Sequence, residues 1–451
     1  MEKNVNLDPI LATLEEIYQN LHSRRGLSLG FLSNQSFDFE AVSPFLNLHI
    51  SNIGDPWLAR NTLLNTREQE KEVLEYFAGL WNAIPRTPLI PESYWGYILG
   101  MGATEGNLYS LWSAREYFRN KVISGKSNHT ASGHPVLFYS LESHYSVEKC
   151  AGLLCITTFQ EIGNQYYPDQ CPVSADGCWP RGVPVDENGS VEPESLALLV
   201  GFFAAKGHPP IIVLNLGSTF MGAFDDPALV WQHLSPVLAQ YGFCTQTDSD
   251  SQPDCWTHID GALGAAYLPY LEMAYQQQLT PARGPQFDFS LPYVNSIVMS
   301  SHKWYGAPFA SGIYMSREKY RMRPATHPEY VDSPDTTLSG SRNGLSALLL
   351  WYSTATITYQ KQTETAARCA ALAVYAAEQL ETVKNDHPSF KIAHSPPSLM
   401  VRFTRPQDRI FERFHLSGRG KLAHIVTMPH VTRSAIDQLV CALRGREAFA
   451  D

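Results

Sequence analysis

Three short runs of consecutive apolar residues lie in the middle of the chain, at 136–139, 211–216 and 296–299. Continuous apolar runs of this length are typical of strands that are covered on both faces of a sheet. Helical spacing of apolar positions recurs between or beside them, as at 108–119 and 147–154. Strands that alternate with helices predict a doubly wound α/β domain whose sheet is mainly parallel.

The N-terminal sixty residues follow a different pattern. Apolar positions at helical spacing predict one helix around 10–21, and a polar connection marked by Gly54 and Pro56 follows it. We expect residues 1–60 to form an arm that packs on something else, such as a second subunit. A second helix is predicted around 68–81, near the start of a large domain that we assign to 61–325.

The pattern changes again after about residue 325. An alanine-rich stretch predicts one long helix around 345–383. Two strand-like pieces and a last helix follow, at 399–403, 425–428 and 433–443. We expect residues 326–451 to form a smaller α+β domain.

Composition narrows the class of protein. The chain has 451 residues, 44% of them hydrophobic, and a formal net charge of −10 without a long Lys/Arg run, which argues against a nucleic-acid surface. The most apolar stretch, 196–217, is interrupted by Lys206, His208 and two prolines, so no membrane span is expected. Eight scattered cysteines without a CxxC pair, and a first segment without an apolar signal core, predict a soluble protein of the cytoplasm.

Polar residues gather where the predicted strands end. Thr219, Asp260 and Lys303 all fall where predicted strands give way to loops. In an open α/β sheet, ligands bind beyond the carboxyl ends of the strands. Because lysine is among the residues least often buried, Lys303 at the end of a core strand needs a functional reason.

Asp260 stands among small and apolar residues, and a buried carboxylate is costly unless a positive partner or several donors meet it. Read alone, it could cap a loop or the next helix. A metal site with His258 lacks a nearby third ligand, so we expect no metal.

Two further motifs are ambiguous when read alone. Small residues and a hydroxyl at 102–107 precede a helical pattern and suit either a phosphate or a simple helix cap. His144 follows the strand at 136–139 and could be a capping or core histidine as well as a catalytic one. Together with a lysine and a buried acid, these parts fit pyridoxal phosphate, which needs an amine, an acidic partner for its ring nitrogen and a phosphate cradle.

Six motifs occur in the order found in one family: GATEGN, SHYSV, NLGSTFMGAFDD, HIDGA, SSHKW and DTTLSGSRNG. Over roughly residues 50–360 the chain resembles the group II pyridoxal-phosphate-dependent amino-acid decarboxylases, and most nearly their branch of bacterial histidine and plant serine decarboxylases. The resemblance implies an aspartate aminotransferase-like, type I fold of PLP-dependent enzymes. It also implies an amino-acid substrate, release of CO2 and the amine, and a homodimer with active sites at its interface.

The resemblance also assigns residues. Lys303 is similar to the lysine that forms the Schiff base, and Asp260 to the carboxylate paired with the ring nitrogen. Ala262 and His144 resemble the residues on the two faces of the ring, and Thr219 a hydroxyl near the 3'-oxygen or the substrate carboxylate. Phosphate contacts are implied for Ala103, Thr104, Ser300 and His302. Tyr330 resembles the mobile-loop tyrosine that protonates the substrate carbon, which makes Lys303, Tyr330 and His144 the implied catalytic residues.

Departures from the branch concern the wall of the pocket. Leu345 stands where that branch has histidine, Ser218 replaces a threonine, and 307–312 departs from the Pro-Cys-Gly-like ending common there. Arg342 could bind a substrate carboxylate, form a surface ion pair or have a structural role near the dimer contact. Decarboxylation-coupled oxidative deamination to an aldehyde and a non-catalytic relative remain alternatives, and an aminotransferase fits the motifs less well.

Overall fold

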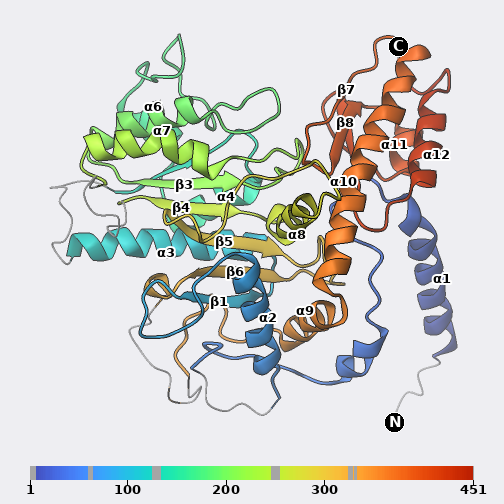
Figure 1. The fold of residues 1–451 in the computed structure, drawn as a ribbon, viewed down its shortest axis with the longest axis horizontal. Helices are drawn as coiled ribbons and strands as arrows, with labels where there is room; N and C mark the ends of the chain where they lie inside the picture. The colour runs from blue at the N-terminus through green and yellow to red at the C-terminus, as the bar shows by residue number, and fades with distance from the viewer. Residues whose placement is uncertain are drawn as a thin grey trace. The chain divides into compact units, whose positions relative to one another are not determined.

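The computed structural model describes residues 7–58, 64–123, 134–244, 254–322, 329 and 333–449. The chain divides into two compact units, one over 37–367 and one formed by 1–36 together with 368–451 (Figure 1). This division assigns 37–60 and 326–367 to the larger unit. The predicted boundaries near residues 60 and 325 stay a prediction.

The larger unit is built on a six-stranded mixed sheet in the order β1-β6-β5-β4-β3-β2. Strands β5, β4, β3 and β2 run parallel, whereas β6 is antiparallel to both of its neighbours, β1 and β5. Every residue of these six strands is buried, as the continuous apolar runs at 136–139, 211–216 and 296–299 predict for three of them. The strands are β1 (Tyr94–Leu99), β2 (Val136–Tyr139), β3 (Pro210–Asn215), β4 (Trp256–Asp260), β5 (Val294–Ser300) and β6 (Gly312–Arg317).

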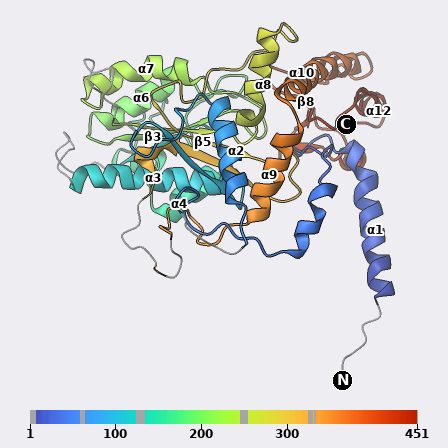
Figure 2. The ribbon, with the colours of Figure 1, turned by 60° about the horizontal axis from the view of Figure 1, so that its bottom comes forward.

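Helices follow the strands along the chain and cover the sheet. They are α2 (Arg67–Leu80), α3 (Ala103–Ile123), α4 (Tyr145–Leu154), α5 (Phe159–Tyr166), α6 (Pro193–Ala204), α7 (Pro227–Gln240), α8 (Gly264–Gln276) and α9 (Gly344–Thr356). Figures 1 and 2 place α3 on one side of β3 and the pair α6–α7 on the other.

Successive side chains of β2 contact helices on the two opposite faces of the sheet. Leu137 belongs to an apolar cluster with Leu111 of α3. Phe138, the next residue, stacks on Phe159 of α5 and meets Phe203 of α6 edge to face. Because successive side chains of a strand point to opposite faces, both faces of this strand are apolar. The prediction of a doubly wound, mainly parallel sheet is confirmed.

The predicted single helix over 345–383 is wrong, because the structure has two helices there. Helix α9 ends at Thr356, and α10 spans Tyr359–Glu381. Ile357 between them has an extended backbone, and the Thr358 hydroxyl accepts the Lys361 N–H at 3.2 Å, which caps the start of α10. A run of three β-branched residues, 356–358, favours a break that the surrounding alanines conceal.

The second unit contains a four-stranded antiparallel sheet in the order β7-β8-β10-β9. Its elements are α1 (Asp8–Arg24), β7 (Ile392–Ala393), β8 (Met400–Thr404), α11 (Asp408–Arg413), β9 (Ser417–Arg419), β10 (Leu422–Val426) and α12 (Arg433–Leu443). The N-terminal segment joins this unit through Leu29, whose carbonyl accepts the Val426 N–H at 2.7 Å. None of the helices in the described ranges is both long and apolar enough to cross a membrane.

Candidate active site

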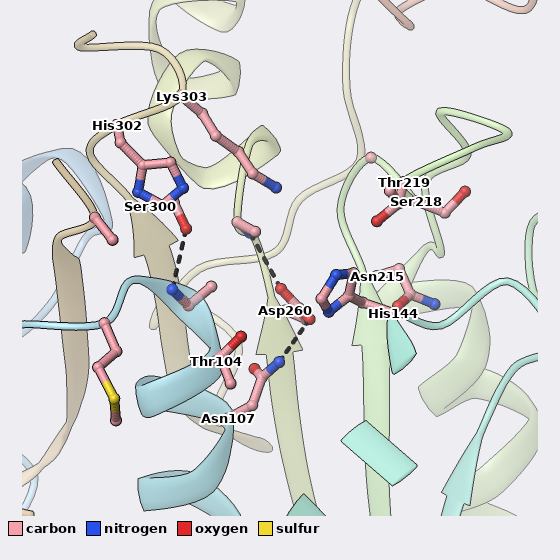
Figure 3. Close-up of a pocket in the computed structure, with 15 residues that line it drawn as sticks. Thr104, Asn107, His144, Asn215, Ser218, Thr219, Asp260, Ser300, His302 and Lys303 are labelled. Carbon is pink, nitrogen blue, oxygen red and sulfur yellow. Dashed lines mark hydrogen bonds between the residues drawn. The ribbon is translucent and has the colours of Figure 1, made fainter. Parts of the chain in front are cut away.

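A cavity of about 190 Å³ opens where β3, β4 and β5 end and α3 begins (Figure 3). Nine of the ten residues assigned from the sequence line it: Ala103, Thr104, His144, Thr219, Asp260, Ala262, Ser300, His302 and Lys303. The tenth, Tyr330, lies outside the described residues. The topology therefore brings together motifs that are up to 200 positions apart in the sequence.

Lys303 enters the cavity just beyond the end of β5. Its side chain and those of Asp260 and His144 turn toward the same space in Figure 3. Burial lowers the pKa of the Lys303 amine, and the Asp260 carboxylate partly opposes this effect. The next residue, Trp304, is buried and its indole N–H donates to Gln362 at 3.0 Å, which anchors the turn that carries the lysine.

Asp260 is the last residue of β4 and is buried at the floor of the cavity. Its carboxylate accepts the Asn107 side-chain amide at 2.9 Å and the Ala262 N–H at 3.2 Å. Two donors and the nearby lysine offset the cost of burying this charge.

His144 caps a helix and lines the cavity at once. It is the N-cap of α4, and its Nδ1 accepts the Ser146 N–H at 3.3 Å and lies 2.7 Å from the Ser146 hydroxyl. Burial lowers the pKa of the ring, with Lys303 adding to the effect and Asp260 opposing it. The capping and active-site readings of this residue are therefore compatible.

The start of α3 forms one wall of the cavity. Its Ala103 N–H donates to the Ser300 hydroxyl at 3.0 Å. The Glu105 carboxylate holds the preceding turn, because it accepts the N–H groups of Gly100 and Met101 at 2.7 and 2.9 Å. The N-terminal end of a helix favours an anion such as phosphate, and the Ser300 hydroxyl bonded to Ala103 lies at the same place.

Gly102 allows this turn to approach its neighbours closely. Its φ is +69°, in the left-handed region, and an added Cβ would lie 2.7 Å from Cε1 of His302. Only glycine fits both conditions without displacing the histidine ring.

The chain is similar to known proteins of one family. The conserved domain of the pyridoxal-dependent decarboxylases matches residues 47–404. The chain belongs to this family. The decarboxylase is similar to serine decarboxylase 2 of Oryza sativa subsp. japonica, with 31% identity over 92% of this chain and 73% of the relative. Histidine decarboxylase of Vibrio campbellii is 29% identical over 96% of this chain and 94% of the relative.

A solved structure covers nearly the whole decarboxylase. The L-methionine decarboxylase of Streptomyces sp. 590, in its internal aldimine form, matches with a TM-score of 0.90 and 35% identity over 98% of this chain and 96% of the other. The type I fold and the group II resemblance are thereby confirmed. The decarboxylase is a lyase that acts on amino acids with pyridoxal phosphate, and the amine, the buried acid and the helix start described above fit this cofactor.

Arg342 of the decarboxylase lies in a buried ion pair. Its guanidinium contacts the Glu70 carboxylate and also donates to the Gly54 carbonyl at 3.0 Å. Glu70 in turn accepts the Asn52 amide at 2.9 Å and the Ile98 N–H at 3.0 Å. Arg342 is absent from the described lining of the cavity. Of the three interpretations of this arginine the structure favours an ion pair, but the pair is buried and not at the surface as expected.

Removing Arg342 alone should destabilise the decarboxylase. The Arg342→Met variant leaves the Glu70 charge buried without its cationic partner, at an expected cost of about 3–5 kcal/mol in the free energy of unfolding. Neutralising both partners, as Glu70→Gln with Arg342→Met, should cost less. Urea unfolding of the three proteins measures the difference. A loss below about 1 kcal/mol for the single variant would contradict the ion-pair interpretation.

The lining also contains residues to which the sequence assigns no role, among them Asn107 and Asn215. Asn107 lies one helical turn after Ala103 and therefore faces the same way. Asn215 is the last residue of β3 and donates to the Ser140 hydroxyl at 3.0 Å. Their positions, four residues after the helix start and at a strand end, are the signals that could have identified them.

Behind Asp260, the His258 ring is fully buried, and burial lowers its pKa to about 4 from an ordinary 6.5. As the pH falls below 6.5, the unfolded chain takes up this proton and the folded chain does not. The free energy of unfolding should therefore fall by about 2 kcal/mol between pH 7 and pH 5 because of this ring alone. Urea unfolding at both pH values should give a smaller fall for His258→Gln than for the wild type, and equal falls would contradict the prediction.

Proposed function

We propose that this decarboxylase removes the α-carboxylate of an L-amino acid with an uncharged side chain, releasing CO2 and the amine. The composition of the cavity wall supports this. Among the described lining residues, Asp260 is the only carboxylate and Lys303 the only lysine or arginine. The proposed cofactor role occupies both, so neither is left for a charged substrate side chain.

Lys303 holds the cofactor covalently through its amine in this proposal. The lowered pKa leaves more of the amine neutral and hence nucleophilic. Asp260 faces the ring nitrogen and holds a proton there. Pyridoxal phosphate, when bound, supplies a conjugated ring that accepts the electron pair left by the departing carboxylate.

The remaining lining residues orient the bound groups. We assign the phosphate to the start of α3 and its neighbours, and the two ring faces to His144 and Ala262, with Thr219 beside the ring oxygen or the substrate carboxylate. The phosphate residues are Ala103, Thr104, Ser300 and His302. A proton returns to the substrate carbon from Lys303 or Tyr330. Tyr330 lies outside the described residues, and its role is proposed from the sequence alone.

Methionine is the first substrate to test. The methionine decarboxylase of Streptomyces sp. 590 is 35% identical to this chain, and the serine and histidine decarboxylases to which the chain is similar are 28–31% identical. Phe309, next to the lining residue Ala310, packs with Leu345 in an apolar cluster. Leu345 is also where the branch of histidine and serine decarboxylases has histidine, so an apolar substrate fits this departure.

The experiment is an assay of the purified protein with pyridoxal phosphate and each of L-methionine, L-histidine, L-serine and L-glutamate. We expect CO2 and the amine, with methionine giving the highest kcat/KM and glutamate none. A preference for histidine or serine would contradict methionine as the substrate and favour the activities of the histidine and serine decarboxylase branch. Preference for glutamate would overturn it, as would an aldehyde and peroxide as the main products.

We also propose a homodimer assembled partly through α1. None of the residues of α1 is buried, and an apolar stripe along it is exposed: Ile10, Leu11, Leu14, Ile17, Tyr18 and Leu21. Such a stripe marks an interaction surface, and in a C2 dimer the same surface serves both chains. Light scattering should give twice the chain mass, and Leu14→Glu with Leu21→Glu should lower it while Glu16→Lys does not. A stable, active wild-type monomer would contradict this.

A cytoplasmic location completes the proposal. None of the eight cysteines forms a disulfide in the described part of the chain, and the thiols of Cys155, Cys178 and Cys441 are exposed. Free thiols at the surface persist in reducing compartments. Cell fractionation should recover the protein with soluble cytoplasmic markers, and recovery from the medium would contradict the location.

A further inference from the structure

A line of polar side chains runs from Asp260 away from the cavity into the core of the larger unit. Its members come from α3, β4 and β5, and each has no more than 1% of its surface exposed: Asn107, His258, Ser296, Ser110 and Trp256. Buried polar groups cost free energy unless they are hydrogen-bonded. The continuous chain of hydrogen bonds described below therefore needs an explanation beyond packing.

Element geometry brings these residues together. Trp256, His258 and Asp260 alternate along β4 and so point to one face of the sheet. Ser296 of β5 lies opposite His258 in the register of the two strands. Asn107 and Ser110 lie three residues apart on α3, on the side that packs against this face.

The hydrogen bonds have a single consistent direction. The Asp260 carboxylate only accepts, so the Asn107 group 2.9 Å from it is the amide nitrogen, and the amide oxygen faces His258. The His258 Nε2, 2.9 Å from that oxygen, therefore carries the ring proton. Because burial keeps the ring neutral, Nδ1 accepts from the Ser296 hydroxyl at 2.8 Å.

The hydrogen bonds at the end of the line farthest from Asp260 also have a defined direction. The Trp256 indole only donates, and its N–H lies 3.1 Å from the Ser110 hydroxyl oxygen. Ser110 then donates to the Ser296 oxygen at 2.8 Å. Every donor from Trp256 onward thus points toward Asp260, and hydrogen bonds aligned in a chain polarise and strengthen one another.

We infer that Asn107 and His258, supported by Ser296, Ser110 and Trp256, are positioning residues that keep the Asp260 carboxylate aimed at the ring nitrogen of the cofactor. The inference rests on the proposed role of Asp260. A carboxylate held by a fixed donor has a defined direction, and a donor polarised by its own partners binds it more strongly. Removing His258 leaves the Asn107 amide oxygen without its donor, while the amide nitrogen still donates to the Ser146 hydroxyl at 3.1 Å. The amide is then held on one side only, and the carboxylate loses a polarised donor.

The experiment combines substitutions in the protein with a cofactor analogue that lacks the ring nitrogen. His258→Phe and Ser296→Ala are each reconstituted with pyridoxal phosphate and with its analogue in which a CH group replaces the ring nitrogen. With pyridoxal phosphate, we expect His258→Phe to weaken cofactor binding to the cofactor-free protein and lower kcat, each by about 10- to 100-fold, with a smaller change in KM. With the analogue, the wild type and both variants should have the same affinity and residual kcat.

Two controls separate positioning from folding. Thr257→Val changes a buried residue of the same strand whose side chain points to the opposite face, and it should behave as wild type with both cofactors. His258→Gln keeps an N–H for the Asn107 oxygen and should recover most of the loss. Thermal melting of the cofactor-free variants checks the fold, and Ser296→Ala replaces His258→Phe if the latter does not fold.

The outcomes are distinguishable. Equal losses with both cofactors would mean that the line of polar side chains behind Asp260 is only structural, and this would overturn the inference. Unchanged affinity and kcat with pyridoxal phosphate would overturn it too. If the wild type itself binds both cofactors equally and gains no activity from the ring nitrogen, the proposed role of Asp260 fails instead.

Discussion

Replacing Lys303 with alanine is expected to lower kcat by at least about 10²–10⁴-fold, because one side chain supplies both the covalent link and a proton donor. The variant should still bind pyridoxal phosphate through the start of α3, since Ala103, Thr104 and Ser300 are unchanged. Bound cofactor should then be removable by dialysis, unlike that of the wild type. Steady-state kinetics and absorbance after dialysis measure the two effects.

Lys206 offers a matched control for this experiment. It is also a partly buried lysine, but it packs over the Phe202 ring 3.3 Å from the ring centroid, and the Phe202 carbonyl accepts its amine at 3.2 Å. Lys206→Ala should retain wild-type kcat and the bound cofactor. Retention of kcat and bound cofactor by Lys303→Ala would contradict the proposed role of that lysine.

Asp260→Asn is expected to lower kcat by about 10²–10³-fold while changing KM much less. The amide keeps the size of the side chain but loses the charge opposite the ring nitrogen, an interaction that strengthens as electrons move into the ring during the reaction. Kinetics over a range of substrate concentrations separate kcat from KM. Asp260→Glu keeps the charge but moves it, whereas Asp260→Ala removes it. An equal fall in kcat for these two variants would indicate that the position of the charge matters for catalysis as well as its presence.

Asp225 provides a buried carboxylate for comparison. It accepts the N–H groups of Val191 and Asn215 at 2.7 and 2.6 Å, and burial raises its pKa to about 6. Because Asp225 is not part of the described cavity lining, Asp225→Asn should lower the free energy of unfolding while leaving kcat nearly unchanged. If both aspartate variants lose the same kcat, the special role of Asp260 is contradicted.

Much of the larger unit follows from local patterns. The apolar runs at 136–139, 211–216 and 296–299 become β2, β3 and β5, because strands buried on both faces leave no polar period in the sequence. Strands β1 and β6 are also buried along their whole length, so no alternation of polar and apolar residues marks Tyr94–Leu99 or Gly312–Arg317 as strands. Their antiparallel pairing is a tertiary feature that strand propensity does not encode.

The site divides in a similar way. Lys303 and Asp260 are recognisable because a charge in an apolar setting is unusual in any sequence. Asn107 and His258 are not, because uncharged polar residues in a strand or helix have many ordinary uses. Their function depends on which strands become neighbours, and only the register of β4 with β5 and the packing of α3 place them behind the carboxylate.

Arg342 illustrates the limit from the opposite direction. A lone arginine near the family motifs suggests a ligand for a carboxylate, and sequence alone leaves that reading as good as a structural one. The partner that decides between them, Glu70, lies 272 positions away in α2. Long-range ion pairs of this kind leave no periodic signal in a single sequence.

The most direct measurement is reduction of the purified protein with borohydride in the presence of pyridoxal phosphate, followed by peptide mapping by mass spectrometry. We predict one pyridoxyl group per chain, attached to the peptide that contains Lys303. A label on a different lysine, or no label at all, would contradict it.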